Sequence, residues 1–127
     1  MNTTLPAIKN IAKINNQQIQ VVTENGQKLV PIKPICEILG IDHVSQKKRI
    51  QRDPILSSVE VMMTSTGADK KQYEMTAIPL QYIFGWLFTI QIERVNEESR
   101  PAILSYQRQC YDALWKHFSG HAEYVEY

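Results

Sequence analysis

The chain has 127 residues, of which 43% are apolar and 21% charged, the size and composition of one globular domain. This composition excludes a disordered tail, a coiled-coil rod and a collagen-like chain. The formal net charge of +1, from 14 basic and 13 acidic residues, excludes a uniformly basic nucleic-acid coat protein but allows a local basic patch. Two cysteines, Cys36 and Cys110, are too few for a disulfide-rich secreted domain, so we expect an intracellular protein.

Neither an export signal nor a membrane span is expected. The first residues lack the charged region and continuous apolar run that a signal peptide requires. The longest uncharged stretch, residues 75–92, is interrupted by Pro79, Gln81 and Gly85, whereas a spanning helix needs about 20 mainly apolar residues. We therefore predict a soluble protein with no membrane partner.

The chain is expected to open with a flexible arm, residues 1–17, followed by a single domain over residues 18–118. The first element of that domain is predicted to be a β-hairpin, because β-forming residues flank the pair Asn25-Gly26. Both residues tolerate the positive φ of a type I′ turn, and this pair is the strongest short-range signal for a hairpin.

Residues 33–53 predict two short helices joined by a tight turn. Pro34 suits a first helical turn, and Gly40 is a natural stop after the last one. Asp42 can cap the second helix, which must end before Pro54 because proline disfavours a helical residue ahead of it. The pair has the outline of a helix-turn-helix.

The next segments return to strand and then to helix. Residues 57–77 predict a second hairpin, because two β-forming segments flank a turn at residues 67–70. Residues 79–90 predict a buried helix that begins at Pro79. With the long last helix, the elements predict an α+β fold: a single domain with two β-hairpins, a helix-turn-helix-like pair and a long C-terminal helix.

The last helix, between Pro101 and Gly120, has the clearest pattern. Its apolar residues recur at three- and four-residue steps and fall on one arc at 100° per residue: Ile103, Leu104, Gln107, Cys110, Tyr111, Leu114, Trp115 and Phe118. Core packing is the simple interpretation of this arc. The amide of Gln107 lies near its centre and must be hydrogen-bonded if buried. Either it ties the helix to a loop, or it marks an interface with another chain, for which Gln107, Tyr111 and Trp115 are the candidates.

The most informative local feature is the second short helix, residues 43–52. It carries Lys47, Lys48, Arg49 and Arg52 and no acid, a net charge of +4. Ser45, Lys48, Arg49 and Arg52 share an arc of about 100°, while Val44, Lys47, Ile50 and Gln51 fall on the other side. We expect that other side to pack on the domain through its two apolar residues, Val44 and Ile50. A helix at this place in a helix-turn-helix can enter the major groove, where Arg and Lys reach phosphates and guanine. The alternative is a solvated charged helix with no ligand.

Enzymatic motifs are missing from the sequence. The three histidines are far apart or separated by Gly120, and no Cys-x-x-Cys, His-Glu-x-x-His, glycine-rich phosphate loop or Gly-x-Ser-x-Gly occurs. Cys36 and Cys110 lie on apolar helix faces, where small buried hydrophobes are expected. We predict that the protein is not an enzyme and has no catalytic residues, metal or cofactor.

Several segments in unbroken order resemble the N-terminal domain of phage antirepressor proteins, which is similar in layout to Bro-N-type viral and phage regulatory domains. They are LVPIKPICEILGID (29–42), SQKKRIQRDPILSS (45–58), VMMTSTGADKKQYEM (61–75), GWLFTI (85–90) and YQRQCYDALWKHF (106–118). The resemblance implies a phage- or prophage-encoded transcription regulator in the cytoplasm of a bacterial host. In such proteins the domain usually precedes a C-terminal domain. Residues 119–127 are then either a tail leading to a domain absent from this sequence, or the end of a short stand-alone version.

Two functions follow as expectations. The first is DNA binding through Ser45, Lys48, Arg49 and Arg52. The second is a protein-interaction module that captures a phage repressor or forms a homo-oligomer without touching DNA.

Overall fold

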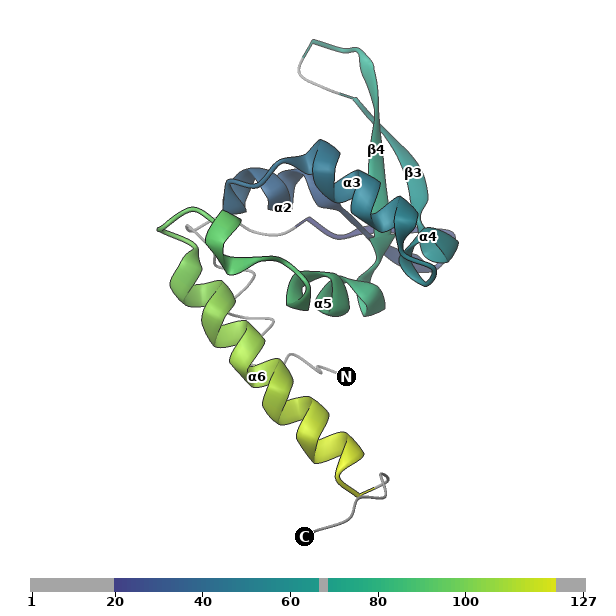
Figure 1. Cartoon of the computed structure of the whole chain (residues 1–127). Helices are drawn as coiled ribbons and strands as arrows, with labels where there is room; N and C mark the ends of the chain where they lie inside the picture. The colour runs from purple at the N-terminus through teal and green to yellow at the C-terminus, as the bar shows by residue number, and fades with distance from the viewer. Residues whose placement is uncertain (1–19, 67–68, 121–127) are drawn as a thin grey trace, which may run out of the picture.

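The computed structural model describes residues 20–66 and 69–120, so the whole of the expected arm, residues 1–17, and residues 121–127 of the expected tail lie outside the described part. Four strands form one antiparallel sheet in the order β1-β2-β4-β3 (Figure 1). They are β1 (Val22–Glu24), β2 (Gln27–Pro31), β3 (Val61–Thr66) and β4 (Gln72–Pro79). Both predicted hairpins are present, and pairing of β2 with β4 joins them into a single sheet.

The turn of the first hairpin has the predicted backbone. Asn25 has φ of 52° and Gly26 has φ of 77°, so both turn residues adopt the positive values that Asn-Gly tolerates. The turn fixes the register, in which Glu24 pairs with Gln27 and Val22 with Leu29. Leu29 and Val30 are buried as a result, and β2 is the strand that reaches β4.

Six helical segments lie in the described part of the chain. They are α2 (Ile32–Leu39), α3 (His43–Arg52), α4 (Leu56–Val59), α5 (Leu80–Phe88), the 3-10 turn η2 (Ile92–Arg94) and α6 (Arg100–Phe118). The helices predicted over residues 33–53, 79–90 and 101–120 are therefore confirmed, and the α+β fold with them.

One boundary of the predicted second hairpin is wrong. Residues 57–59 belong to the short helix α4, and the strand begins only at Val61. The cause is local, because Oδ1 of Asp53 accepts hydrogen bonds from the backbone N–H groups of Ile55 and Leu56, both at 2.9 Å. This side-chain acceptor stabilises a helical turn ahead of the strand.

The core is formed by the sheet together with α2, α3, α5 and the first turns of α6. Its largest fully buried side chains are Trp86 and Tyr106. Buried Ile, Leu and Val side chains from the strands and helices make up most of the rest of this cluster. Cys36 is fully buried in this cluster, and burial raises the pKa of its thiol to about 12. Cys36 therefore packs as a small hydrophobe, as predicted, while Cys110 is half-buried and also a free thiol.

Helix α6 begins against the body of the domain, and its C-terminal half projects away from it (Figure 1). In its first half Ile103 and Tyr106 are buried, and the Tyr106 hydroxyl donates a hydrogen bond to the carbonyl of Phe84. In its last two turns every apolar side chain is exposed, so core packing is the wrong interpretation for that half of the arc. The described helices include none that is both long and apolar enough to cross a membrane.

Candidate nucleic-acid interface

The start of α3 is set by the turn that separates it from α2. Gly40 ends α2 with φ of 71°, and a Cβ at this position would lie 2.9 Å from Nδ2 of Asn96. That amide is itself held by a 2.9 Å hydrogen bond to the carbonyl of Ile38. Glycine is therefore required both by the backbone conformation and by the close approach of Asn96.

Asp42 caps α3 as predicted. Its carboxylate accepts hydrogen bonds from the hydroxyl of Ser45 at 2.6 Å and from the backbone N–H of Ser45 at 3.1 Å. These bonds lower the pKa of Asp42 below its ordinary value, the side-chain bond being the larger cause. The hydroxyl of Ser45, one of the predicted DNA contacts, is thus engaged in the cap.

The buried face of α3 is polar at its centre. Gln46 is 4% exposed, and its Oε1 accepts a hydrogen bond from the indole Nε1 of Trp86 at 3.2 Å. Gln46 occupies the position where a helix-turn-helix usually has an apolar residue, and the Trp86 N–H makes an amide acceptable there. Ile50, one turn later, is fully buried beside it. The predicted packing role of Val44 is wrong, because that side chain is 47% exposed.

The open face of α3 carries two exposed cations, Lys48 and Arg52, together with Val44, Gln51 and the half-buried Ser45. Arg49, also predicted to face DNA, lies at the edge of this face. Its guanidinium donates to the carbonyl of Thr89 at 3.2 Å and to Oε1 of Gln46 at 3.3 Å. Arg49 is exposed, but these hydrogen bonds hold it against the end of α5. Of the four predicted DNA contacts, Ser45 and Arg49 thus already make side-chain hydrogen bonds within the domain.

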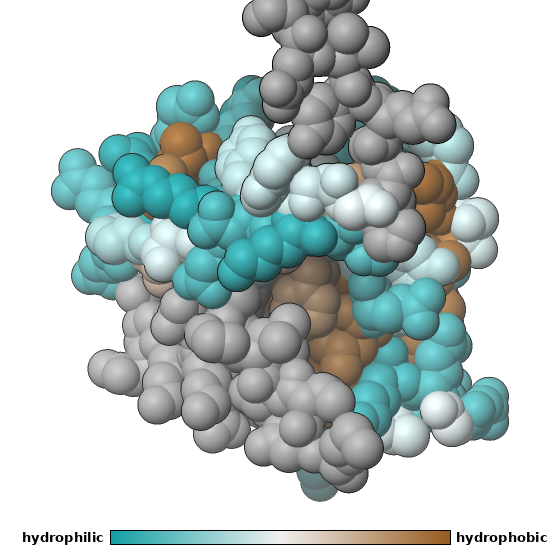
Figure 2. Space-filling model, turned by 90° about the horizontal axis from the view of Figure 1, so that it is seen from below, coloured by the Kyte–Doolittle hydropathy of each residue, from teal (hydrophilic) through white to brown (hydrophobic). Residues whose placement is uncertain are grey.

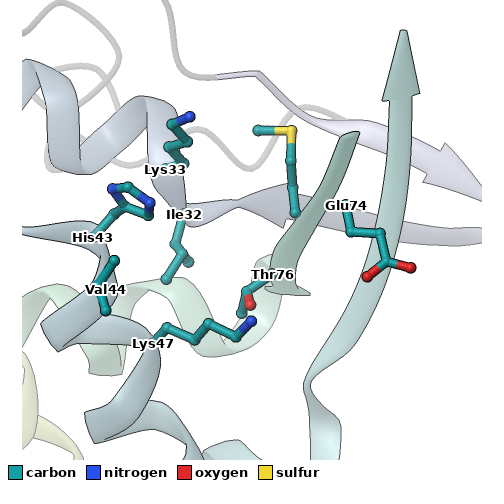
Figure 3. A pocket seen from close by; sticks show the side chains of 8 residues that line it. Ile32, Lys33, His43, Val44, Lys47, Glu74 and Thr76 are labelled. Carbon is teal, nitrogen blue, oxygen red and sulfur yellow. The ribbon is translucent and has the colours of Figure 1, made fainter. Parts of the chain in front are cut away.

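A pocket of about 240 Å³ lies beside α3, between this helix, the start of α2 and strand β4 (Figure 3). Lys33, His43 and Lys47 line it together with Thr76 and Glu74. In Figure 3 the Lys47 side chain extends toward Thr76, whereas the Glu74 carboxylate points away from His43. The cationic surface thus continues from α3 toward β4.

The sequence prediction missed this side of α3. Lys47 belongs to the basic run and was expected on the packing face, where it is in fact half-buried. Lys33 and Thr76 are distant from it in sequence, and only the pairing of β2 with β4 brings the start of α2 near residues 74–76. No local sequence signal connects these residues.

The three predicted interface residues of α6 have different environments. Nε2 of Gln107 lies 2.8 Å from the carbonyl oxygen of Ile90 and 3.3 Å from that of Leu87, so its amide caps the end of α5. Of the two alternatives for this residue, the structure shows the tie within the chain. Tyr111 and Trp115 are 68% and 64% exposed and lie on the projecting half of the helix.

Metal-ligating side chains do not cluster in the described part of the chain. Across residues 20–66 and 69–120, no group of three or more His, Cys, Asp or Glu side chains could hold a metal ion. The open features of the site are therefore the α3 cations and the pocket beside them.

An α+β domain with a basic helix after a tight turn is compatible with many functions, so the fold alone does not identify a role. Comparison with family models is more specific, since the P22_AR N-terminal domain matches residues 10–123. The chain belongs to this family of phage antirepressor N-terminal domains, as the sequence resemblance predicted. Comparisons with curated proteins and with solved structures give no match. The family suggests a phage regulatory role and is not known as an enzyme family.

Proposed function

We propose that this domain binds duplex DNA through α3 as part of phage transcription control. The observation that carries the proposal is the open face of α3, where Lys48 and Arg52 are exposed on a helix without a single acidic residue. The acidic residues next to the helix in sequence are Asp42 and Asp53 at its two ends, and Asp42 is engaged in the N-cap. The face therefore attracts phosphates along its length.

The neighbouring pocket supports the same ligand. Lys33 and Lys47 approach from two different elements, and His43 adds a further hydrogen-bonding group. A phosphate backbone lying between α3 and β4 would meet these side chains while α3 faces the groove. In this arrangement Lys33 and Lys47 contact phosphates beside β4, while Lys48 and Arg52 contact phosphates at the edge of the groove, from which their side chains also reach base edges.

Fluorescence anisotropy with labelled duplexes from phage regulatory regions, at several salt concentrations, tests this proposal. Contacts with four phosphates give a slope of log K against log salt of about −3.6. The double variant Lys48→Glu/Arg52→Glu should bind far more weakly and with a slope reduced in magnitude by about 1.8. The control is Lys28→Glu/Arg94→Glu, which changes the net charge equally at two exposed residues away from α3.

The outcomes separate three interpretations. Preference for one segment over scrambled duplex, lost in the α3 variant alone, supports sequence reading. An equal loss of DNA affinity in the α3 variant and in the control means that DNA is attracted by the net charge of the protein and not by α3. Unchanged affinity in the α3 variant excludes α3 as the interface, and no binding at low salt leaves capture of a phage repressor as the function to be tested.

A further inference from the structure

The last two turns of α6 expose an aromatic ridge, which we define as Tyr111, Trp115 and Phe118. These side chains are 68%, 64% and 54% exposed, and Leu114 beside them is 44% exposed. At 100° per residue they fall on one side of the helix, so they form a continuous apolar surface. Large apolar patches of this kind on a folded domain mark sites of association.

An apolar groove runs beside the ridge, between α5 and α6. It has a volume of about 230 Å³ and is lined by Phe84, Gly85, Phe88, Cys110, Ala113 and Leu114. Gly85 forms part of its wall, and no atom lies within 4 Å of the position that a Cβ would take there. In Figure 2, which views the molecule from below, hydrophobic atoms are visible in a hollow that has hydrophilic side chains above it and to its right.

We propose that two copies of this chain form a dimer through this surface, with the aromatic ridge of each copy seated in the apolar groove of the other. The ridge and the groove are adjacent on one face, so a two-fold rotation can place the ridge of each copy over the groove of the other. A surface that offers both a protrusion and a recess of the same chemistry fits a second copy of itself.

The area that becomes buried is large enough for a specific dimer. An aromatic side chain contributes roughly 150–250 Å² when buried. With the exposed fractions of the ridge and Leu114, each chain has about 500 Å² to bury there, hence on the order of 1,000 Å² per dimer before the groove is counted. The composition also fits, because interface centres are rich in aromatic residues and poor in Lys and Glu.

Analytical ultracentrifugation of the 127-residue chain, from about 1 µM to about 1 mM, measures the association directly. We expect the wild-type chain to be dimeric at the upper concentrations and Tyr111→Ser/Trp115→Ser to be monomeric throughout. Ile55→Ser is the matched control, because Ile55 is as exposed as Trp115 but lies next to α4. Gly85→Leu fills the groove while leaving the ridge intact, and it should raise the dissociation constant at least tenfold.

Fluorescence distinguishes the second copy from other occupants of the ridge. The chain has two tryptophans, of which Trp86 is buried and Trp115 exposed. Dilution of the wild-type protein should shift its emission to longer wavelength and increase acrylamide quenching, while Trp115→Phe, which retains only Trp86, should show neither change.

Three results would overturn the proposal. One is a wild-type chain that stays monomeric over the whole range with Trp115 accessible to quencher. Another is a monomer in which Trp115 is shielded at every concentration, because a segment of the same chain would then cover the ridge. The third is a dimer that survives both the double substitution and Gly85→Leu.

Discussion

At the scale of single residues, Gln46 shows how one long-range hydrogen bond determines whether a polar side chain is buried or exposed. In the sequence it is a polar residue within a basic helix. In the structure it is buried, and its amide oxygen accepts hydrogen bonds from the indole of Trp86 and the guanidinium of Arg49. Gln46 thereby links the α3 helix to α5 and fixes which side of α3 is left for a ligand.

Replacing Gln46 by leucine should destabilise the domain although the position is buried. The substitution leaves the buried indole N–H of Trp86 without its acceptor, which costs about 1–3 kcal/mol in the free energy of unfolding. Urea denaturation measures this loss. Gln51→Leu, the same change at an exposed position of the same helix, should stay within about 0.5 kcal/mol of wild type. Equal effects of the two substitutions would contradict the assigned role of Gln46.

At the scale of elements, α3 owes its start to its N-cap and its orientation to the turn before it. Asp42 supplies the acceptor for the first turn, and Gly40 with Asn96 holds the preceding turn in place. Asn96 also accepts from the N–H of Ser99 at 2.9 Å, and Ser99 donates to the carbonyl of Ile38. The end of α2 is thus tied to the start of α6, which are distant in sequence.

The N-cap of α3 predicts that the free energy of unfolding decreases at acidic pH. Because hydrogen bonds from Ser45 lower the pKa of Asp42 in the folded state below 3.8, its stabilising effect is present above the unfolded pKa. That effect is lost as the pH falls through the folded pKa. We expect Asp42→Asn, which keeps a capping oxygen but does not titrate, to flatten the decrease of unfolding free energy below about pH 4.

Urea denaturation between neutral and acidic pH, followed by circular dichroism, checks this expectation. The pKa of Asp69 is also lowered, by its hydrogen bond from Tyr73, so some acid sensitivity should remain in Asp42→Asn. Asp69→Asn serves as the comparison, because Asp69 lies outside α3, in the turn before β4. A pH profile of Asp42→Asn identical to that of the wild type would mean that the cap carboxylate does not titrate in the expected range.

At the scale of the whole molecule, the two hairpins, α2, α3, α5 and the first half of α6 form one packed body. The β2–β4 pairing and the hydrogen bonds of Asn96 and Gln107 connect parts of the chain that are distant in sequence. The last turns of α6 extend beyond this body, and the outer ends of β3 and β4 project from it on the other side (Figure 1).

Hydrogen exchange should report this division of the molecule. In dilute solution we expect slow exchange in β2, β4 and α5, and faster exchange in α6 after Tyr111 than around Tyr106, because only the first half of the helix is packed. Mass spectrometry of peptic fragments resolves the two halves. Uniform protection along α6 at the lowest concentrations would contradict a helix end that projects from a monomer.

The sequence by itself determined the elements whose causes are local. Asn25-Gly26 specifies the first turn, Gly40 and Asp42 separate α2 from α3, Pro79 marks the start of α5, and helical periodicity predicts α6. It also determined the family, and with it the candidate role of α3. These features depend on backbone preferences and side-chain acceptors within a few residues, so they can be read without knowing the rest of the fold.

Only the tertiary structure decided which faces of these elements are buried. Gln46 is buried where Trp86, forty residues later, supplies an N–H donor, whereas Val44 is exposed at the edge of the pocket beside α3. The pocket between Lys33 and Lys47 exists because β2 pairs with β4. The arc of α6 is a property of the sequence, but its C-terminal aromatic residues stay largely exposed, and within the described residues only Tyr111 of the ridge makes a ring contact with α5, edge-on to Phe88 at 5.2 Å. Periodicity shows that a helix has an apolar face, whereas burial depends on whether another surface meets that face.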